Sequence, residues 1–575
     1  MQTAAMRFHR AIACLLLALA WTASSLADQP RFVDACTLIG SDDSARWSEQ
    51  ELWAWSAICK GEIADLRHPP LVSQAQPLSP DLSAKFIKML LLQEPWRSAT
   101  PSQGVRIIGA HFRETIDLEA AAIAHHLSFT DAKFDAALVL DGAQLSGGLS
   151  LDGSQLRCLT LTNAKIAGDL SMVGTHVMQS PVAMDGLGVA GALTMKHAQL
   201  PTVYLRSAKI SGSASLDAAR AADIDMDGIS IGGRLTLQDA DNQHSQVQWL
   251  WLGGGKIGGL LRLDAAELGY RDPPYHSLDA PGLQVGGDLT MVFTTFADAS
   301  FKNAKIEGDL SLAGAKQLSG SQPKVDLTGA TIRGAFILGT QWYGSVRWQP
   351  GAYLILRNTT VRDVEDGKGD CALPDIKHHP DIVCSPMPWP DKLDLEDFHY
   401  QRFGSSDLYS VSGMKGRSLD WWLDWLGREQ QFSLQPYEKL ASALRAYGLS
   451  DTANEILVAE HQLERAKVSW NSKAWMTALW LFIGYGYHPF WVLRWVLILV
   501  VAGAVVLRIS GQGKENNMPY GITFSVDMLL PIIRLRESNY KIELKGFARY
   551  YFYVHKVMGY VIVAFLGAGL SGLAK

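Results

Sequence analysis

The chain has 575 residues, too many for one ordinary hydrophobic core, so we expect several domains. Its formal net charge is −5, with 52 Lys and Arg against 57 Asp and Glu, and no basic stripe stands out. This balance excludes the electrostatic signature of nucleic-acid binding, which depends on clustered positive charge.

Residues 1–27 have the layout of a secretory signal peptide. Met1–Arg10 is short and basic, Ala11–Trp21 is apolar, and Ser25–Ala27 ends in small residues. That order is typical of a signal cleaved after Ala27, and it indicates export of the mature chain. An uncleaved membrane anchor is the alternative.

Residues 28–104 are expected to form a helical N-terminal cap. Ser48 and Glu51 make a capping-box pattern, and Ser79-Pro80 is expected to begin a second helix. The apolar residues near one face of that second helix are Phe86, Met89, Leu90 and Leu91. A cap is expected here because an open stack of repeats exposes sheet edges and core at its end.

Residues 105–361 contain a repeated phrase: a branched apolar residue, a spacer, Gly, a spacer, then alternating apolar residues. The copies start at Leu145, Ile166, Val189, Ile210, Ile231, Ile257, Val285, Ile306 and Ile332. Successive starts lie 21 to 28 residues apart, a spacing typical of stacked repeat units.

Within a repeat the apolar period is 2, which is the period of a strand. In LTLTNAKIAGDLSM, the residues expected to point inward are Leu159, Leu161, Ala164, Ile166, Leu170 and Met172. We therefore predict a mainly β protein, with a right-handed β-helix solenoid over residues 105–361.

Export predicts oxidising conditions for the cysteines. The expected disulfides are Cys36 with Cys59, and Cys371 with Cys384. The second closes a loop and linker over residues 362–390 that also holds His378 and His379, so a zinc site is the alternative there. Cys158 lies on a repeat strand and is expected to be a small buried core residue.

After the solenoid, residues 391–472 are expected to form a helical hairpin. Pro436 begins its first helix and Gly448 ends it. The hairpin resembles a single tetratricopeptide-like unit, which is too little to indicate a peptide-binding groove.

Residues 473–575 are predicted to be a membrane region with spans at about 491–508 and 552–573. Ala474–Tyr487 is apolar but short, so we expect an interfacial helix there. Between the spans lie Arg508, Lys514, Arg534, Arg536, Lys541, Lys545 and Arg549. This basic excess predicts a cytoplasmic loop, which agrees with a periplasmic repeat domain anchored in a bacterial inner membrane.

The whole order resembles a family of bacterial membrane-associated pentapeptide-repeat-like proteins. The matching segments are GVRIIGAHF from Gly104, QPYEKLASALRAYG from Gln435, YGYHP from Tyr485, FSVDMLLPII from Phe524 and HKVMGYVIVAFLGAGLSGL from His555. Relatives are sometimes labelled membrane-associated oxidoreductases. The resemblance implies a solenoid with paired C-terminal spans, but no established biochemical activity.

The motif that most resembles a redox-cofactor binding site is the glycine run containing Gly253, Gly255 and Gly258, which satisfies GxGxxG. A dinucleotide-binding fingerprint needs a helix directly afterwards, within a βαβ unit. Here the next residues continue the repeat, and Ile257 itself starts a copy. We interpret these residues as turn glycines and predict no cofactor.

Asp223, Asp225 and Asp227 alternate with apolar residues and would share an outer face. Such carboxylates suit a polysaccharide-cleaving or calcium site, although a solvated strand face has the same pattern. Trp249 and Trp251 also alternate and should share a face. If outward they could stack on sugar or peptide; we expect them in the core.

Phe524–Ile533, between the spans, resembles in position the pore helix of two-span channels. RLRESNY stands where filter carbonyls would be needed, so we expect instead an amphipathic interfacial helix with Asp527 and Arg534 at its polar edge.

These patterns favour a membrane-anchored periplasmic scaffold or interaction protein without evident catalysis. Its expected partners are the membrane and a protein or envelope polymer, with no nucleic acid, and a homo-oligomer is left open. The alternative is an envelope enzyme acting on polysaccharide along the solenoid face. A third hypothesis is a channel-like or transport-associated subunit.

Overall fold

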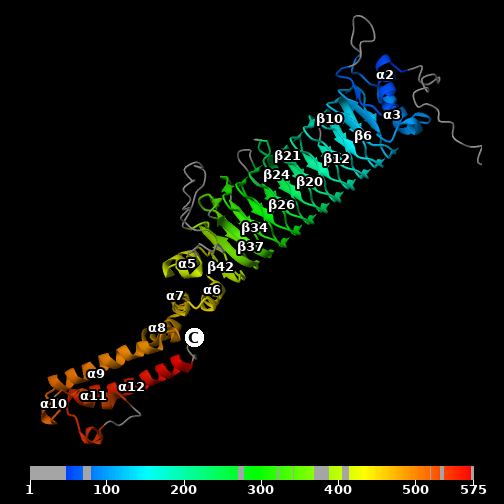
Figure 1. Cartoon of the computed structure of the whole chain (residues 1–575). Helices are drawn as coiled ribbons and strands as arrows, with labels where there is room; N and C mark the ends of the chain where they lie inside the picture. Colours follow the sequence, from blue (N-terminus) through cyan, green and yellow to red (C-terminus); the bar gives the residue numbers. More distant parts are fainter. Residues whose placement is uncertain are drawn as a thin grey trace, which may run out of the picture. The chain divides into compact units, whose positions relative to one another are not determined.

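The repeated phrase folds into a stack of parallel strands. In the computed structural model, the apolar residues that start the repeats pair in register, from Leu145 with Ile166 through to Ile306 with Ile332. All of these starts are buried, with at most 2% of the residue surface exposed. The prediction of a β-solenoid is confirmed, with about 10 turns (Figure 1).

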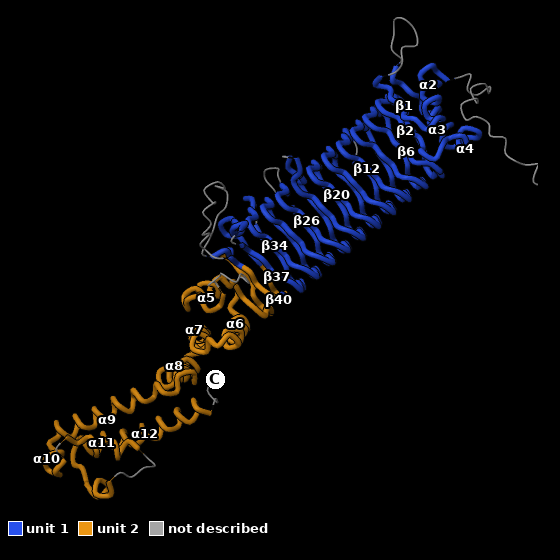
Figure 2. Tube along the Cα trace, viewed as in Figure 1, with its two compact units in different colours: residues 1–354, 360–362, 366–390 blue, residues 355–359, 363–365, 391–575 orange. Residues whose placement is uncertain are grey.

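The described parts of the chain are residues 47–68, 79–179, 181–241, 243–269, 277–319, 323–340, 342–367, 387–404, 413–518, 520–530 and 536–571. The chain forms two compact units (Figure 2). The first comprises residues 1–354, 360–362 and 366–390, and the second comprises residues 355–359, 363–365 and 391–575.

A typical coil of the first unit has four short strands, as between β11 and β14. The strands on two sides of the coils are β1 Ala64–Asp65, β2 Val105–Ile108, β5 Ala122–Ile123, β6 Leu127–Thr130, β8 Gln144–Leu145, β9 Leu149–Ser150, β11 Lys165–Ile166, β12 Leu170–Ser171, β15 Gly188–Val189, β16 Leu193–Thr194, β19 Lys209–Ile210, β20 Ala214–Ser215, β22 Ser230–Ile231, β23 Leu235–Thr236, β25 Lys256–Ile257, β26 Leu261–Arg262, β29 Gln284–Val285, β30 Leu289–Thr290, β33 Lys305–Ile306, β34 Leu310–Ser311, β37 Thr331–Thr340 and β38 Gly344–Ser345.

The strands on the other sides are β3 His111–Phe112, β4 Ile116–Asp117, β7 Lys133–Val139, β10 Gln155–Thr160, β13 His176–Val177, β14 Val182–Ala183, β17 Gln199–Leu200, β18 Val203–Tyr204, β21 Arg220–Asp225, β24 Gln246–Trp251, β27 Glu267–Leu268, β28 Leu278–Asp279, β31 Thr295–Phe296, β32 Ala299–Ser300, β35 Lys316–Gln317 and β36 Lys324–Asp326. The chain passes between the two units within β39 (Tyr353–Ile355) and β40 (Thr360–Asp366).

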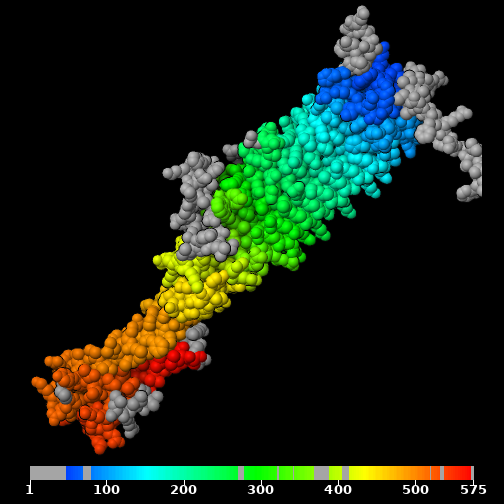
Figure 3. Space-filling view, in the orientation of Figure 1, coloured from blue at the N-terminus to red at the C-terminus, as the bar shows by residue number. Residues whose placement is uncertain are grey.

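The core consists of columns of apolar side chains, one from each coil. A second column runs in register through Leu170, Leu193, Ala214, Leu235, Leu261, Leu289, Leu310 and Phe336. Each full burial of such a leucine stabilises the fold by about 1.5–3 kcal/mol. The outer surface of the solenoid is likewise made of successive coils. In Figure 3 the colours follow one another along it in sequence order.

Glycine allows the coils to approach closely at one corner. A Cβ atom on Gly258 would lie 2.3 Å from the carbonyl oxygen of Gly232, and one on Gly286 would lie 2.2 Å from that of Gly258. The glycine of the repeated phrase is therefore required by stacking.

The N-terminal helices are α2 (Glu49–Ile58), α3 (Ala84–Leu92) and α4 (Trp96–Ala99). The capping box of Ser48 and Glu51 is confirmed, and Glu51 also accepts hydrogen bonds from Ser83. The expected start of the second helix at Ser79-Pro80 is wrong, since Ser83 is its N-cap. Pro80 is instead held in an extended segment by a hydrogen bond from the backbone N–H of His111.

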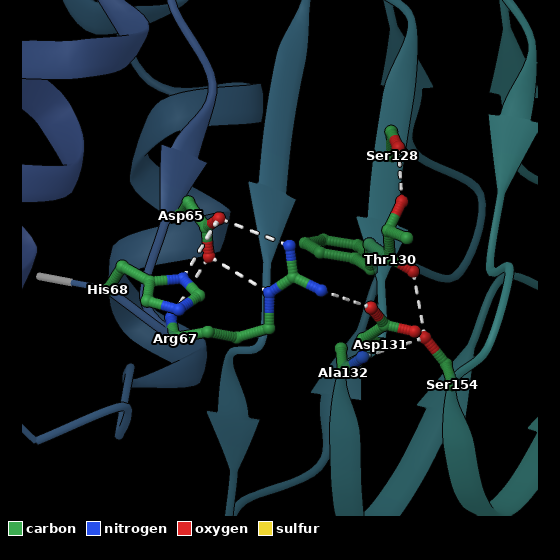
Figure 4. A network of polar contacts seen from close by, with 9 residues as sticks. Asp65, Arg67, His68, Ser128, Thr130, Asp131, Ala132 and Ser154 are labelled. Carbon is green, nitrogen blue, oxygen red and sulfur yellow. Dashed lines mark hydrogen bonds and ion pairs between the residues drawn. The ribbon is translucent and has the colours of Figure 1, made fainter.

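The ladder begins before the predicted limit of residue 105, because β1 pairs in parallel with β2. Just after β1, Arg67 crosses Gly109 and donates to Asp131, 2.8 Å away, while it also pairs with Asp65 (Figure 4). The side chain thus links the first strand to the end of β6, two strands along the stack.

The second unit contains β41 (Lys392–Asp394), β42 (Arg402–Phe403) and a series of helices. Phe403 pairs in parallel with Val364 of β40, so strand pairing continues beyond residue 361. The helices are α5 Leu419–Gly427, α6 Gln435–Ala446, α7 Ser450–Lys467, α8 Trp470–Ile483, α9 Val492–Ile509, α10 Gln512–Glu515, α11 Ile522–Leu529 and α12 Phe547–Ser571, with short 3-10 turns at Met414–Gly416, Gly484–Gly486, Pro489–Trp491 and Glu537–Lys541.

The expected hairpin is α6 and α7, begun by Pro436 and interrupted by Gly448 at a φ of +77°. Two helical stretches among the described residues are long and apolar enough to cross a membrane. These are Pro489–Ile509, of 21 residues, and Phe547–Ser571, of 25 residues. The second helix begins five residues before the predicted span.

Candidate functional site

The outer side of one strand column carries alternating aromatic and acidic residues. Tyr204, Asp225, Trp251 and Asp279 pair in register on β18, β21, β24 and β28. We call these four residues the aromatic–acidic row. Their side chains point outward, because the residue before each one is in the core.

A second pair lies beside the row, where Asp223 is in register with Trp249. The rings of Trp249 and Trp251 stack, with centroids 3.6 Å apart and planes inclined by 26°. Both tryptophans are half-buried and outside the core, so the expectation that they belong to the core is wrong. Val247 and Leu250 of the same strand fill the core instead.

The three predicted aspartates lie together on this outer face, alternating with buried Ile224 and Met226. The backbone N–H of Asp227 donates to Asp225, and Asp227 in turn accepts from the backbone N–H of Gly253. Among the described residues, no group of three or more His, Cys, Asp or Glu side chains is arranged to hold a metal ion.

Asp225 has the most distinctive environment in the row, with a side chain that is only 17% exposed. This burial raises the pKa of the Asp225 carboxyl, and the nearby charges of Asp227 and Asp185 act in the same direction. The hydrogen bond from the backbone N–H of Asp227 opposes this pKa shift, and so does the charge of Arg206, whose Nε lies 3.9 Å from Asp225 and whose closer partner is Asp185 at 2.5 Å. The raised pKa favours the protonated form of this carboxyl, which can donate as well as accept a hydrogen bond.

Tyr204, Arg206 and Asp279 were missed by the sequence reasoning. The Arg206 guanidinium lies 4.9 Å from the centre of the Tyr204 ring. The signal that could have found the row is the repeat interval itself. Tyr204, Asp225, Trp251 and Asp279 are separated by 21, 26 and 28 residues, as are the repeat starts from Ile210 onward.

In the glycine run, Gly253 and Gly255 lie between β24 and β25, and Gly258 lies between β25 and β26. Gly254 has a positive φ of +62°, and Gly258 lies at the close approach between coils. The run therefore meets the needs of the stack and is not followed by the helix that a pyrophosphate site requires.

The cysteine predictions have mixed outcomes. Cys36, Cys371, Cys384, His378 and His379 lie outside the described residues, so both disulfides and the zinc alternative stay predictions. Cys158 is partly exposed with an outward side chain, so its expected place in the core is wrong.

The segment between the apolar helices also differs from its prediction. Asp527 is buried on α11, where its side chain accepts from the backbone N–H of Arg536 at 3.0 Å and from Asn539 at 2.9 Å. The expectation that Asp527 lies at a polar edge is therefore wrong; Arg534 lies outside the described residues. Asp527 holds the following loop against α11, and Ser525 contacts His555 of α12.

Comparison with models of known protein families, with curated proteins and with solved structures found no match to this chain.

Proposed function

We propose that this protein is a membrane-anchored scaffold whose solenoid binds an extended envelope polymer or protein. One observation carries the proposal: a rigid parallel stack and two helices of membrane-spanning length occur in one chain. Uniform coils present the same register position repeatedly, which suits a long ligand better than a small one.

The proposed orientation has the solenoid on the periplasmic side of a bacterial inner membrane. The signal-like residues 1–27 and the basic residues between the apolar helices both support it. The pentapeptide-repeat-like resemblance is part of the same proposal. The proposed orientation predicts that the segment after Ser510 is cytoplasmic and that the segment before Trp47 is exported.

Topology reporters fused at these two positions of the full-length chain test the orientation. A phosphatase reporter should be active only before Trp47, and a cytoplasmic fluorescent reporter only after Ser510. The opposite pattern, or recovery of the intact chain without membranes, would refute the anchored periplasmic scaffold.

A second candidate function is an enzyme acting on envelope polysaccharide, and Asp225 favours it. Glycan-cleaving sites use a pair of carboxyl groups, one of which has a raised pKa and acts as an acid. Asp225 has that property, and Asp223 lies two residues away on the same face. The neighbouring tryptophans are partly exposed aromatic side chains on which sugar rings can pack.

Turnover and binding separate the two functions. Purified full-length protein should bind envelope glycan, with binding reduced by Trp251→Ala but not by Trp342→Ala, which removes an exposed tryptophan from a different coil. Glycan cleavage abolished by Asp225→Asn would establish the enzyme. Binding unchanged by Trp251→Ala would exclude the aromatic–acidic row from either function.

A further inference from the structure

A cavity of about 830 Å³ lies between the C-terminal part of α9, α10 and the start of α11. Its aliphatic lining comes from the apolar helix α9, through Val501, Ala504 and Val505. Its polar lining comes from Arg508, Lys514 and Tyr520, which lie at the end of that helix and in the following segment. The cavity thus combines an apolar part and a cationic part.

Two glycines shape this space. A Cβ atom on Gly521, whose φ is +64°, would lie 2.8 Å from the Leu507 side chain. A Cβ atom on Gly513 would lie 3.3 Å from the Leu507 carbonyl oxygen. Both glycines line the cavity, so its floor is formed where the backbone packs closely against α9.

Two cationic side chains, Arg508 and Lys514, line the cavity. Both side chains are exposed, and within the described residues neither forms an ion pair. The described lining also contains no carboxylate, while the adjacent Glu515 is hydrogen-bonded to Gln512. Arg508 in the last turn of α9 is favoured by the helix dipole, but Lys514 lies outside that helix.

The apolar part of the cavity is also exposed. Val501 is 54% exposed and Val505 is 47% exposed, although both belong to a helix of membrane-spanning length. A 21-residue helix is about 30 Å long, the thickness of a bilayer core, so its last turn falls at the lipid–water boundary. Exposed cations at this boundary attract lipid phosphate.

We propose that this cavity binds one anionic phospholipid, with its phosphate at Arg508 and Lys514 and an acyl chain along Val501 and Val505. The inference rests on the proposed membrane anchoring and adds a specific lipid partner to it. Charge complementarity selects an anionic lipid, and the aliphatic lining selects a lipid over free phosphate.

The experiment measures lipid binding to the detergent-purified full-length protein by native mass spectrometry. The probes are dioleoyl phosphatidylglycerol, dioleoyl phosphatidylcholine and inorganic phosphate. We expect phosphatidylglycerol to bind and phosphatidylcholine to bind at least about 10-fold more weakly, because each nearby cation contributes several-fold in affinity.

Three variants test the site. Arg508→Gln with Lys514→Gln should lower phosphatidylglycerol affinity by about 10- to 30-fold, whereas the control Lys541→Gln, an exposed cation outside the lining, should leave it unchanged. Val505→Trp keeps both cations but fills the apolar part, and should also reduce lipid binding. Circular dichroism of each variant confirms that it is folded.

Equal losses in the double variant and in Lys541→Gln would overturn the proposal, because general loop charge would explain them. Equal binding of inorganic phosphate, or retention of lipid by Val505→Trp, would also overturn it. Membrane fractionation of the same variants is a separate readout. If wild-type protein stays in the membrane fraction but does not select phosphatidylglycerol, the lipid site is wrong and the membrane anchoring stands. If wild-type protein is found outside the membrane fraction, the membrane anchoring itself is wrong.

Discussion

Glu460 of α7 should make the stability of the α6–α7 hairpin depend on pH. The residue is 3% exposed, and its Oε2 atom has no hydrogen-bond partner within the described residues. Burial raises the pKa of this carboxyl from 4.5 to about 7, and the charges of Glu438 and Glu464 add to the shift. The ionised form is therefore disfavoured in the folded hairpin.

The direction of the effect follows from proton linkage. Because the folded pKa lies above the unfolded one, the folded state binds the proton more tightly, and stability falls as pH rises. The contribution is complete below pH 4.5 and is lost as pH rises through about 7. Between about pH 5.5 and about pH 8, one such group changes the free energy of opening by about 2 kcal/mol.

Hydrogen exchange of the full-length protein measures this change in peptides from residues 450–467, after correction for intrinsic exchange rates. Wild-type protection should fall by about 2 kcal/mol over that pH range, and Glu460→Gln should remove most of the fall. The control Asp451→Asn changes an exposed carboxyl on the same helix and should keep the fall. A slope retained in Glu460→Gln would refute the assignment to the glutamate.

Three further predictions concern packing. Gly286→Ala should destabilise the solenoid by about 1–3 kcal/mol in thermal unfolding, since its Cβ would lie 2.2 Å from the Gly258 oxygen. Gly188→Ala, whose nearest contacts would be at 3.8 Å, is its control and should change little. Leu289→Ala should cost about 2–5 kcal/mol in chemical denaturation, and a value near zero would contradict the continuous core column. Gly559→Ala should displace α11, because its Cβ would lie 1.9 Å from a backbone oxygen of that helix. Faster tryptic cleavage between residues 536 and 546 would report the displacement.

Much of the solenoid could be predicted because each coil repeats the same burial requirement. The inward residues of the LTLTNAKIAGDLSM copy, from Leu159 to Met172, are all at most 1% exposed, as expected. Periodicity succeeds here since one face of every short strand meets the core and the other meets water.

The two wrong core assignments have one physical cause. On β10, β21 and β24 the chain turns a corner within a single strand, and two consecutive residues lie outside the core there. Cys158 occupies that corner on β10 and Trp249 on β24, where strict alternation would place them inside. Beyond the corner the alternation resumes one residue out of phase, which places Trp251 outside as well.

The site residues could not be read from one copy of the repeat, because the aromatic–acidic row is made of one residue from each of four coils. Only the coil lengths bring them together. An insertion of five residues between Ile231 and Ile257, relative to the 21-residue interval, leaves the register intact, so Trp251 still meets Asp225. Alignment by repeat start is therefore the appropriate way to find surface sites on this fold.

In the membrane region, the amphipathic pattern of α11 did not predict the position of Asp527. Amphipathicity places a charge on the wet side only when a helix has one wet side and one packed side. α11 packs against both α9 and α12, where Ser525 lies beneath Gly503 and Leu529 lies against Gly559. A carboxylate there needs internal donors, and the loop after α11 supplies them to Asp527 through a backbone N–H and an asparagine amide. Asp527 therefore provides an acceptor for the backbone N–H of Arg536, in the segment that returns the chain to α12.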